Sequence, residues 1–342
     1  MTLAPFARGV ALVALLATSS CRRDEARPFR PATPDALSAT PAVATASVPQ
    51  GSGGSVSQAP PPAPPPPATT DAAPPPSATP SAPVMPSAGS SATPSPSPDA
   101  PATCRGAAPA QGTTRSVGGR TFHVWTPAAY DGRQRLPVVV VFHGWYATGK
   151  AFQTWFKMEE HVRGEAIVVY PDAAGPMWSL VDERDTTFVA GLLDDVAATY
   201  CADRARVLAF GFSFGGKFTH KLGCTSTKLV KAIAVGDGSL GGGLVGCGSL
   251  PVLVTHRTRD DDERFAWGKT AAETWARGNG CTSATDPIDP AHGCVAFRGC
   301  KPGAPVTFCE DTYFNPSWPH DWNHTVREEY RDLTWAWFSK VP

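Results

Sequence analysis

Arg206-Val-Leu-Ala-Phe-Gly211-Phe-Ser213-Phe-Gly215 is the stretch that decides the fold. An apolar run ends in Gly-x-Ser-x-Gly, and a helix is predicted to follow from Phe214. A serine in this context sits on a tight strand-to-helix turn, where side chains at 211 and 215 would clash. The turn would lift the Ser213 hydroxyl above a sheet, beside the free N–H groups of the helix. The pattern predicts a nucleophilic serine; the alternative is a glycine-rich helix start with Ser213 as its capping residue.

Apolar runs that alternate with helical patterns surround this turn. Strands are predicted over 120–125, 137–142, 166–170, 206–211, 230–235 and 251–255, and helices over 187–200, 214–222, 264–277 and 325–339. Alternating β and α units predict an α/β fold with a mostly parallel central sheet and helices on both faces. The segment 278–305 is polar and lacks periodicity, so we expect a long loop stapled by its cysteines.

A reactive serine needs a base and an acid that orients the base. In this fold the chain order is serine, acid, histidine. The acid is expected just after the strand at 251–255, where Asp260 lies nearest the strand end and Asp261 is the chief alternative. Two histidines precede the last predicted helix. We favour His320, in the loop proper and flanked by aromatic residues, over His324, which would lie in or beside the first helical turn.

Backbone N–H groups are expected to stabilise the negative charge that develops on the substrate. Phe214 would supply one of them from the start of its helix, and Gly144 or Trp145 would supply the other from the loop after the strand at 137–142. His143 is expected to orient that loop by hydrogen bonding. Asp237, in the glycine-rich stretch 236–243, is expected to be structural.

The N-terminal third differs in composition from the rest. Residues 1–20 carry Arg8, an apolar run and small residues before Cys21, which predicts a secretory signal of the bacterial lipoprotein type. Cys21 would then be lipidated; the alternative is cleavage near Ser20 with Cys21 left free. Residues 21–103 hold 22 of the 36 prolines and only Phe29 as an aromatic, so we expect a disordered linker. Residues 104–342 remain as one catalytic domain.

The net charge and the cysteines limit which partners the chain is expected to have. The formal net charge is zero, which argues against nucleic acid and against a polybasic membrane surface. Membrane contact is therefore expected only through a lipid on Cys21. Eight further cysteines in an exported chain predict disulfides. The cysteines lack the CxxC and paired-histidine pattern of a zinc site, so we expect no metal. We also expect no cofactor and a monomer.

From Thr113 to Phe338 the chain resembles carbohydrate esterase family 1, the secreted esterases that include polyhydroxybutyrate depolymerases and feruloyl and acetylxylan esterases. The shared motifs occur in family order at 120–127, 136–144, 169–172, 211–216, 279–281 and 320–322. The resemblance implies an α/β-hydrolase fold and an acyl-enzyme on Ser213, with Asp260 as the acid and His320 as the base. The chain departs from the family pattern at Lys217, Arg257 and Pro319, which leaves the substrate class open.

The leading hypothesis is therefore an exported serine esterase, lipid-anchored to the cell envelope or secreted. Its candidate substrates are feruloyl or acetyl esters of polysaccharide and polyhydroxyalkanoate-type polyesters. The alternative outside the enzymes is a decayed hydrolase-fold lipoprotein that acts as a binding module. A serine peptidase on the same fold is a third hypothesis.

Overall fold

The computed structural model describes residues 109–241, 244, 247–317 and 323–341. The predicted signal, Cys21, the linker and His320 lie outside these residues. Ten strands form one sheet in the order β1-β2-β4-β3-β5-β6-β7-β10-β9-β8. The strands are β1 (Gln111–Val117), β2 (Arg120–Trp125), β3 (Leu136–Phe142), β4 (Ile167–Pro171), β5 (Ala202–Phe212), β6 (Ala232–Gly236), β7 (Val252–Arg257), β8 (Thr285–Asp289), β9 (Cys294–Phe297) and β10 (Val306–Asp311).

The sheet is parallel at its centre and antiparallel at both edges. Strands β4, β3, β5, β6, β7 and β10 run parallel to their neighbours. The β1–β2 hairpin adds to β4 antiparallel, and β9 and β8 continue antiparallel from β10. The predicted α/β fold with a mostly parallel sheet is confirmed. The carboxyl ends of the parallel strands share one edge of the sheet, which is where such folds hold their sites.

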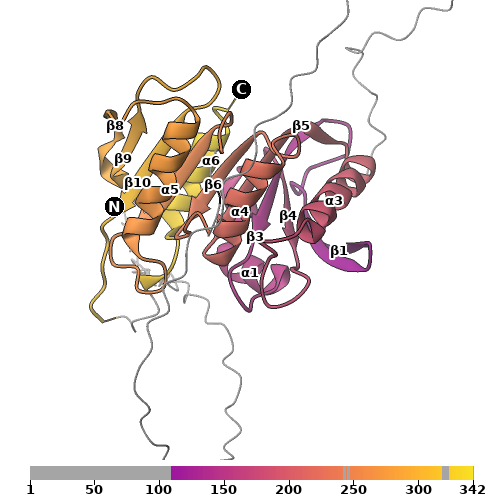
Figure 1. Cartoon of the computed structure of the whole chain (residues 1–342). Coiled ribbons are helices and arrows are strands. Elements are labelled where there is room, and N and C mark those ends of the chain that lie inside the picture. Colours follow the sequence, from indigo (N-terminus) through magenta and orange to yellow (C-terminus); the bar gives the residue numbers. More distant parts are fainter. Residues whose placement is uncertain (1–108, 242–243, 245–246, 318–322, 342) are drawn as a thin grey trace, which may run out of the picture. The chain divides into compact units, whose positions relative to one another are not determined.

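Helices cover both faces of the sheet. They are α1 (Gly149–Phe156), α2 (Met158–His161), α3 (Arg184–Tyr200), α4 (Phe214–Thr225), α5 (Phe265–Gly278) and α6 (Glu328–Phe338). In Figure 1, α3, α4 and α5 lie in front of the sheet and α6 lies behind it. The fully buried strand β3 shows why both layers form. Val138 and Val140 belong to the hydrophobic cluster under α3, α4 and α5, whereas Val139 and Val141 belong to the cluster under α1, α2 and α6. An all-apolar strand needs cover on each side.

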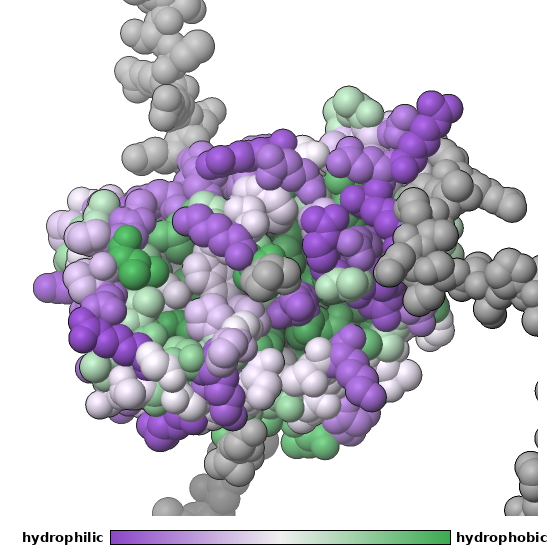
Figure 2. Space-filling view, turned by 90° about the horizontal axis from the view of Figure 1, so that it is seen from above, coloured by the Kyte–Doolittle hydropathy of each residue, from purple (hydrophilic) through white to green (hydrophobic). Residues whose placement is uncertain are grey.

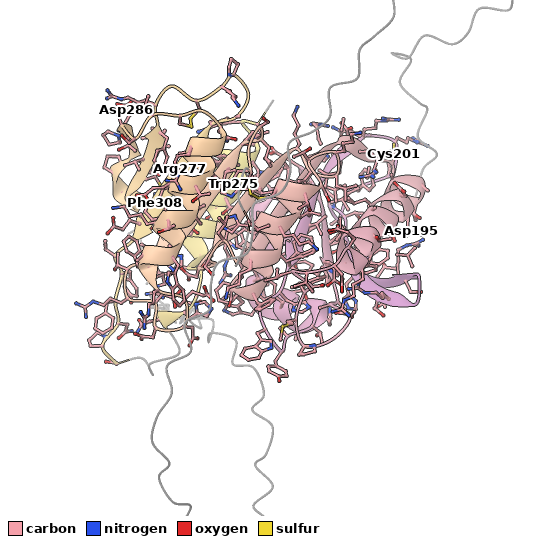
Figure 3. The ribbon with its side chains drawn as sticks, viewed as in Figure 1. Asp195, Cys201, Trp275, Arg277, Asp286 and Phe308 are labelled. Atoms are coloured by element: carbon pink, nitrogen blue, oxygen red, sulfur yellow. A yellow bond between two sulfur atoms is a disulfide. The ribbon has the colours of Figure 1, made fainter. Side chains whose placement is uncertain are left out.

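Helices α4 and α5 meet through a buried aromatic contact. Trp275 of α5, labelled in Figure 3, is fully buried, and its Nε1–H donates to His220 Nδ1 of α4 at 2.9 Å. Burial lowers the pKa of His220 to about 3, so the ring is neutral and can accept this bond. Gly223 of α4 lies where an added Cβ would stand 3.3 Å from the Trp275 ring. The contact fixes α4, which begins at the serine turn, against α5.

The segment 278–305 is not the structureless loop predicted from its sequence. It contains β8, the 3-10 turn Pro290–His292 and β9. The strand pattern was missed because β8 reads Thr-Asp-Pro-Ile-Asp and is largely exposed. Disulfides Cys281–Cys300 and Cys294–Cys309 do staple the segment, as predicted. A further bridge joins Cys224 to Cys247, and Cys201 is disulfide-bonded as well.

Among the described residues, no helix is both long enough and apolar enough to cross a membrane. On the face shown in Figure 2, hydrophilic and hydrophobic residues are interspersed.

Candidate active site

Ser213 stands on a strained turn between β5 and α4. Its φ is 54° and its ψ is −121°, a conformation that costs a non-glycine residue about 1–3 kcal/mol. The flanking glycines are required for steric reasons. A Cβ at Gly211 would lie 2.2 Å from Gly215 O, and a Cβ at Gly215 would lie 2.3 Å from Phe142 O. The clash expected from the motif is therefore present on both sides of the serine.

The Ser213 hydroxyl is not used as a helix cap. Ser213 occupies the N-cap position of α4, but its side chain makes no capping hydrogen bond. The alternative interpretation of the motif, a capping serine, is therefore wrong. The Ser213 backbone N–H donates to Gly236 O at 3.0 Å, which ties the turn to the end of β6. The residue as a whole is half-buried.

Asp260 lies in the loop after β7, where the acid was expected. Its side chain is fully buried, and its Oδ1 accepts hydrogen bonds from the N–H groups of Asp262 and Glu263 at 2.9 and 2.8 Å. Its Oδ2 lies 2.8 Å from Nδ1 of His324. Asp261, the alternative acid, is exposed. Asp260 is thus held by its own loop with one oxygen directed at an imidazole.

The histidine that meets Asp260 is His324. The favoured candidate, His320, lies outside the described residues. The His324 ring packs against Phe212, with ring centroids 4.7 Å apart, and Phe212 directly precedes Ser213. His324 Nε2 is buried and has no hydrogen-bond partner among the described residues. His324 is the second choice from the sequence because the last helix is predicted to begin at residue 325. In the structure α6 begins at Glu328, so His324 lies in the loop before it.

The loop after β3 lies against the serine. A Cβ at Gly144 would stand 3.4 Å from Ser213 Cβ. His143 is fully buried, and its Nδ1–H donates to Gly144 O at 2.7 Å while Nε2 accepts from Ala173 N at 3.2 Å. Burial lowers the pKa of His143, which keeps the ring in the neutral form that can make both bonds. Phe214, on the other side, is the first residue of α4, and its N–H has no acceptor within the helix.

Two aromatic side chains project from the same loop. Trp145 and Tyr146 are 50% and 53% exposed, and their rings stack with centroids 4.9 Å apart and an interplanar angle of 28°. The Tyr146 N–H donates to Pro176 O at 2.8 Å, which anchors the tip of the loop. Large exposed aromatic surface is typical of a site that binds a ligand.

A second carboxyl group lies at the Asp260–His324 pair. Ligand atoms of Asp237, Asp260 and His324 all lie within 4.8 Å of one another, a spacing that could hold a metal ion. Nδ1 of His324 and Oδ2 of Asp260 are hydrogen-bonded to each other, an arrangement that is also suited to proton transfer. From the sequence, only a structural role is expected for Asp237. The sequence does place Asp237 at the carboxyl end of a predicted strand, and the next strand along the chain is the one that precedes Asp260.

Comparison with known proteins decides the family. Feruloyl esterase C of Emericella nidulans is 30% identical over 209 residues, which cover 56% of this chain and 74% of that protein. The chain belongs to the feruloyl esterase family. Feruloyl esterase D of Neurospora crassa is 29% identical over 221 residues, 58% of this esterase and 75% of the relative. An acetyl xylan esterase from Aspergillus awamori aligns with TM-score 0.49 and 16% identity over 66% of this chain and 100% of its own. No family model matches the chain.

This esterase is accordingly a carboxylic ester hydrolase of the serine type with an α/β-hydrolase fold, as the sequence predicted. Its substrates are esters. The disulfides of the described residues are of the kind found in exported proteins.

When the pH is lowered, the activity of this esterase is expected to fall with a midpoint above pH 6.5. Burial acts to lower the pKa of His324, but the hydrogen bond and charge of Asp260 outweigh it, so the pKa lies above its usual 6.5. Only the neutral imidazole can accept a proton, so kcat/KM rises as the pH passes that pKa. A pH profile with p-nitrophenyl acetate checks this. Asp260→Asn is expected to move this acid limb of the pH profile to lower pH. An acid limb below pH 6.5 in the wild type would contradict His324 as the base.

Proposed function

We propose that this esterase hydrolyses feruloyl-type esters, in which an aromatic hydroxycinnamoyl group is joined to a sugar hydroxyl. The observation that carries the proposal is the 30% identity to a feruloyl esterase across 74% of that protein. The stacked pair Trp145–Tyr146 supports it, because a flat aromatic acyl group can lie against such a surface, and the pair follows Gly144, which lies against the serine. Acetyl esters of polysaccharide and polyhydroxyalkanoate-type polyesters are the competing substrates.

In the proposed first step Ser213 forms the acyl-enzyme. Its Oγ attacks the ester carbonyl carbon, and Nε2 of His324 takes the hydroxyl proton. Asp260 holds Nδ1–H and stabilises the imidazolium that results. The N–H of Phe214 and that of Gly144 or Trp145 bind the oxyanion of the tetrahedral intermediate. Collapse of that intermediate breaks the ester bond, and the leaving alcohol takes the proton from His324.

In the second step water releases the acid. His324, neutral again, accepts a proton from water, and the hydroxyl attacks the acyl carbon on Ser213. The second tetrahedral intermediate collapses, and the proton on Nε2 returns to Ser213 Oγ. Both steps use the same base and the same oxyanion donors, so no metal or further group is needed to balance them.

Removing the indole of Trp145 should weaken the enzyme selectively toward aromatic acyl groups. Trp145→Ala is expected to lower kcat/KM for methyl ferulate about tenfold, because a stacking contact worth about 1 kcal/mol and its buried area are lost. For p-nitrophenyl acetate, whose acyl group has no ring, about twofold is expected. Trp145→Phe keeps a ring and should retain most of the ferulate activity.

A substrate panel tests the class of ester itself. Wild-type enzyme is compared on methyl ferulate, acetylated xylan and short-chain polyhydroxybutyrate. The proposal requires the highest kcat/KM on methyl ferulate. Faster cleavage of acetylated xylan or of the polyester would overturn it and leave the esterase assignment intact.

The two acidic candidates can be separated by substitution. Asp260→Asn is expected to lower kcat about 10²-fold, because an amide at Oδ2 would donate to Nδ1 and hold the wrong tautomer of His324. Asp261→Asn should change kcat by less than about twofold, since Asp261 is an exposed side chain. Rates on p-nitrophenyl acetate, with thermal unfolding as the control for folding, decide the matter. The reverse order would show that Asp261 is the acid.

We also propose that residues 1–20 export the chain, that Cys21 carries a lipid and that residues 21–103 form a stalk for the domain at 104–342. The apolar run before Cys21 and the proline content of the stalk support this. The enzyme would then act as a monomer at the cell envelope. Mass spectrometry of the mature N-terminus tests the anchor: a diacylglyceryl group on Cys21 is expected, and an unmodified cysteine would contradict it.

A further inference from the structure

Asp237 is a buried carboxyl group that the proposed mechanism does not use. It follows β6 directly and holds a positive φ of 47°. Its N–H donates to Thr255 O at 3.0 Å, and its Oδ1 accepts from the N–H of Arg257 at 2.8 Å. Its Oδ2 is buried and has no hydrogen-bond partner among the described residues. Because buried polar atoms are nearly always paired, this unused oxygen needs an explanation.

The sheet brings this carboxyl group to the catalytic histidine. Strands β6 and β7 are parallel neighbours, with Gly236 paired to Thr255. Asp237 leaves the end of β6, and Asp260 lies in the loop that leaves β7. An oxygen of each and a ring nitrogen of His324 lie within 4.8 Å of one another. Two acids from adjacent strands therefore face the His324 imidazole, and Asp260 Oδ2 also lies 3.5 Å from Nε2 of His256.

We propose that Asp237 is a reserve acid for His324, a positioning residue that takes over the hydrogen bond to Nδ1 when Asp260 cannot supply it. The inference rests on the proposed function, because it assumes that His324 is the base for Ser213. In the intact enzyme Asp260 holds Nδ1 at 2.8 Å and Asp237 stands by in its protonated form.

The protonated state of Asp237 follows from its surroundings. Burial, and next the charge of Asp260, raise the pKa of Asp237 well above its usual value, against the opposing effects of His324 and Arg257. Two adjacent ionised carboxylates would repel, so one of them keeps its proton. Removal of Asp260 removes that repulsion, and Asp237 can then release its proton to solvent and accept Nδ1–H.

Other charged groups also face Asp237. A small cavity of about 10 Å³, room for about one water molecule, adjoins it. The titratable and charged side chains that line this cavity with Asp237 are His256, Arg257, Asp311 and Tyr330. These groups are unchanged in the variants below, so differences between variants report on the acids that are replaced.

The test is a set of variants assayed with p-nitrophenyl acetate from pH 5 to 10 in EDTA. Asp260→Ala removes the first acid and, unlike asparagine, leaves Nδ1 free for a new partner. It is compared with Asp237→Asn, with the double variant and with Asp260→Ala/Asp261→Asn as the matched control. Because Asp260 also holds its loop, Asp260→Ser, which keeps an acceptor, serves as a second background if the alanine variant does not fold.

A reserve acid predicts a non-additive pattern. Asp237→Asn alone is expected to cost about threefold, and Asp260→Ala about 10²-fold. The double variant should lose at least about 30-fold more than Asp260→Ala, well beyond the threefold of independent sites. The kcat of Asp260→Ala should also rise with pH as Asp237 ionises, and this limb should vanish in the double variant. A merely structural Asp237 would not produce such a limb.

Several outcomes would overturn the inference. One is a double variant within about threefold of Asp260→Ala, or an Asp260→Ala profile whose alkaline limb persists without Asp237. A loss from Asp237→Asn as large as that from Asp260→Ala would make Asp237 a primary acid and not a reserve. If Asp260→Ala retained full activity while Ser213→Ala were inactive, the assignment of the acid would fail and the esterase function would stand.

Discussion

Ser213→Ala is expected to lower kcat for p-nitrophenyl acetate by about 10³-fold or more, a barrier increase of about 4 kcal/mol or more. The turn at φ 54° presents this hydroxyl between the start of α4 and the Gly144 loop, and a methyl group cannot form the acyl bond. Binding and the oxyanion donors would remain, so a small residual rate is expected.

Two controls sharpen this result. Ser226 lies at the far end of α4, so Ser226→Ala should leave the rate unchanged. Intact protein mass after mixing with substrate should show an acyl adduct on the wild type and none on Ser213→Ala. If wild type and Ser213→Ala were equally inactive, the chain would be a decayed hydrolase that binds without hydrolysing.

The choice of base has the next largest expected effect. His324→Ala is expected to lower kcat by about 10³-fold, because it removes the proposed proton acceptor, which pairs with Asp260 and packs against Phe212, the residue before Ser213. His320→Ala is expected to cost less than about fivefold. Rates at pH 8 on p-nitrophenyl acetate, beside the melting temperature of each variant, make the comparison.

The same pair of variants can refute the assignment. A large loss in His320→Ala with near-normal rates in His324→Ala would return the catalytic role to His320. His324→Gln is the matched control for size: it retains a hydrogen bond to Asp260 but cannot accept the proton, so it should fold like wild type and remain inactive. Substantial activity in that variant would show that His324 only packs against Phe212.

Local chemistry explains why much of the site could be predicted. Gly211 is required by its close approach to Gly215 within the motif, so that part of the motif carries its own structural context. Gly215 is required by its approach to Phe142 O at the end of β3, a contact that only the folded sheet provides. Asp260 could be placed because an acid was expected where a strand ends. Continuous valines in β3 likewise predict a strand that is covered on both faces.

What could not be predicted depends on contacts between distant segments. The choice between His320 and His324 turns on where α6 begins, and two or three residues move a side chain from loop to helix. Asp237 gains its role from the pairing of β6 with β7, which its own neighbours in the sequence do not reveal. Strand β8 has proline and two aspartates in five residues; pairing with β9 and two disulfides hold it, not an apolar face.

The backbone at Ser213 has a consequence for how such a protein can change over time. Glycine adopts positive φ without the steric cost that serine bears, so a chain with glycine at this position would have a more stable fold. Selection for thermal resistance alone would therefore erase the nucleophile. Serine persists at φ 54° only while hydrolysis itself is under selection, which makes this residue a marker of use as well as of mechanism.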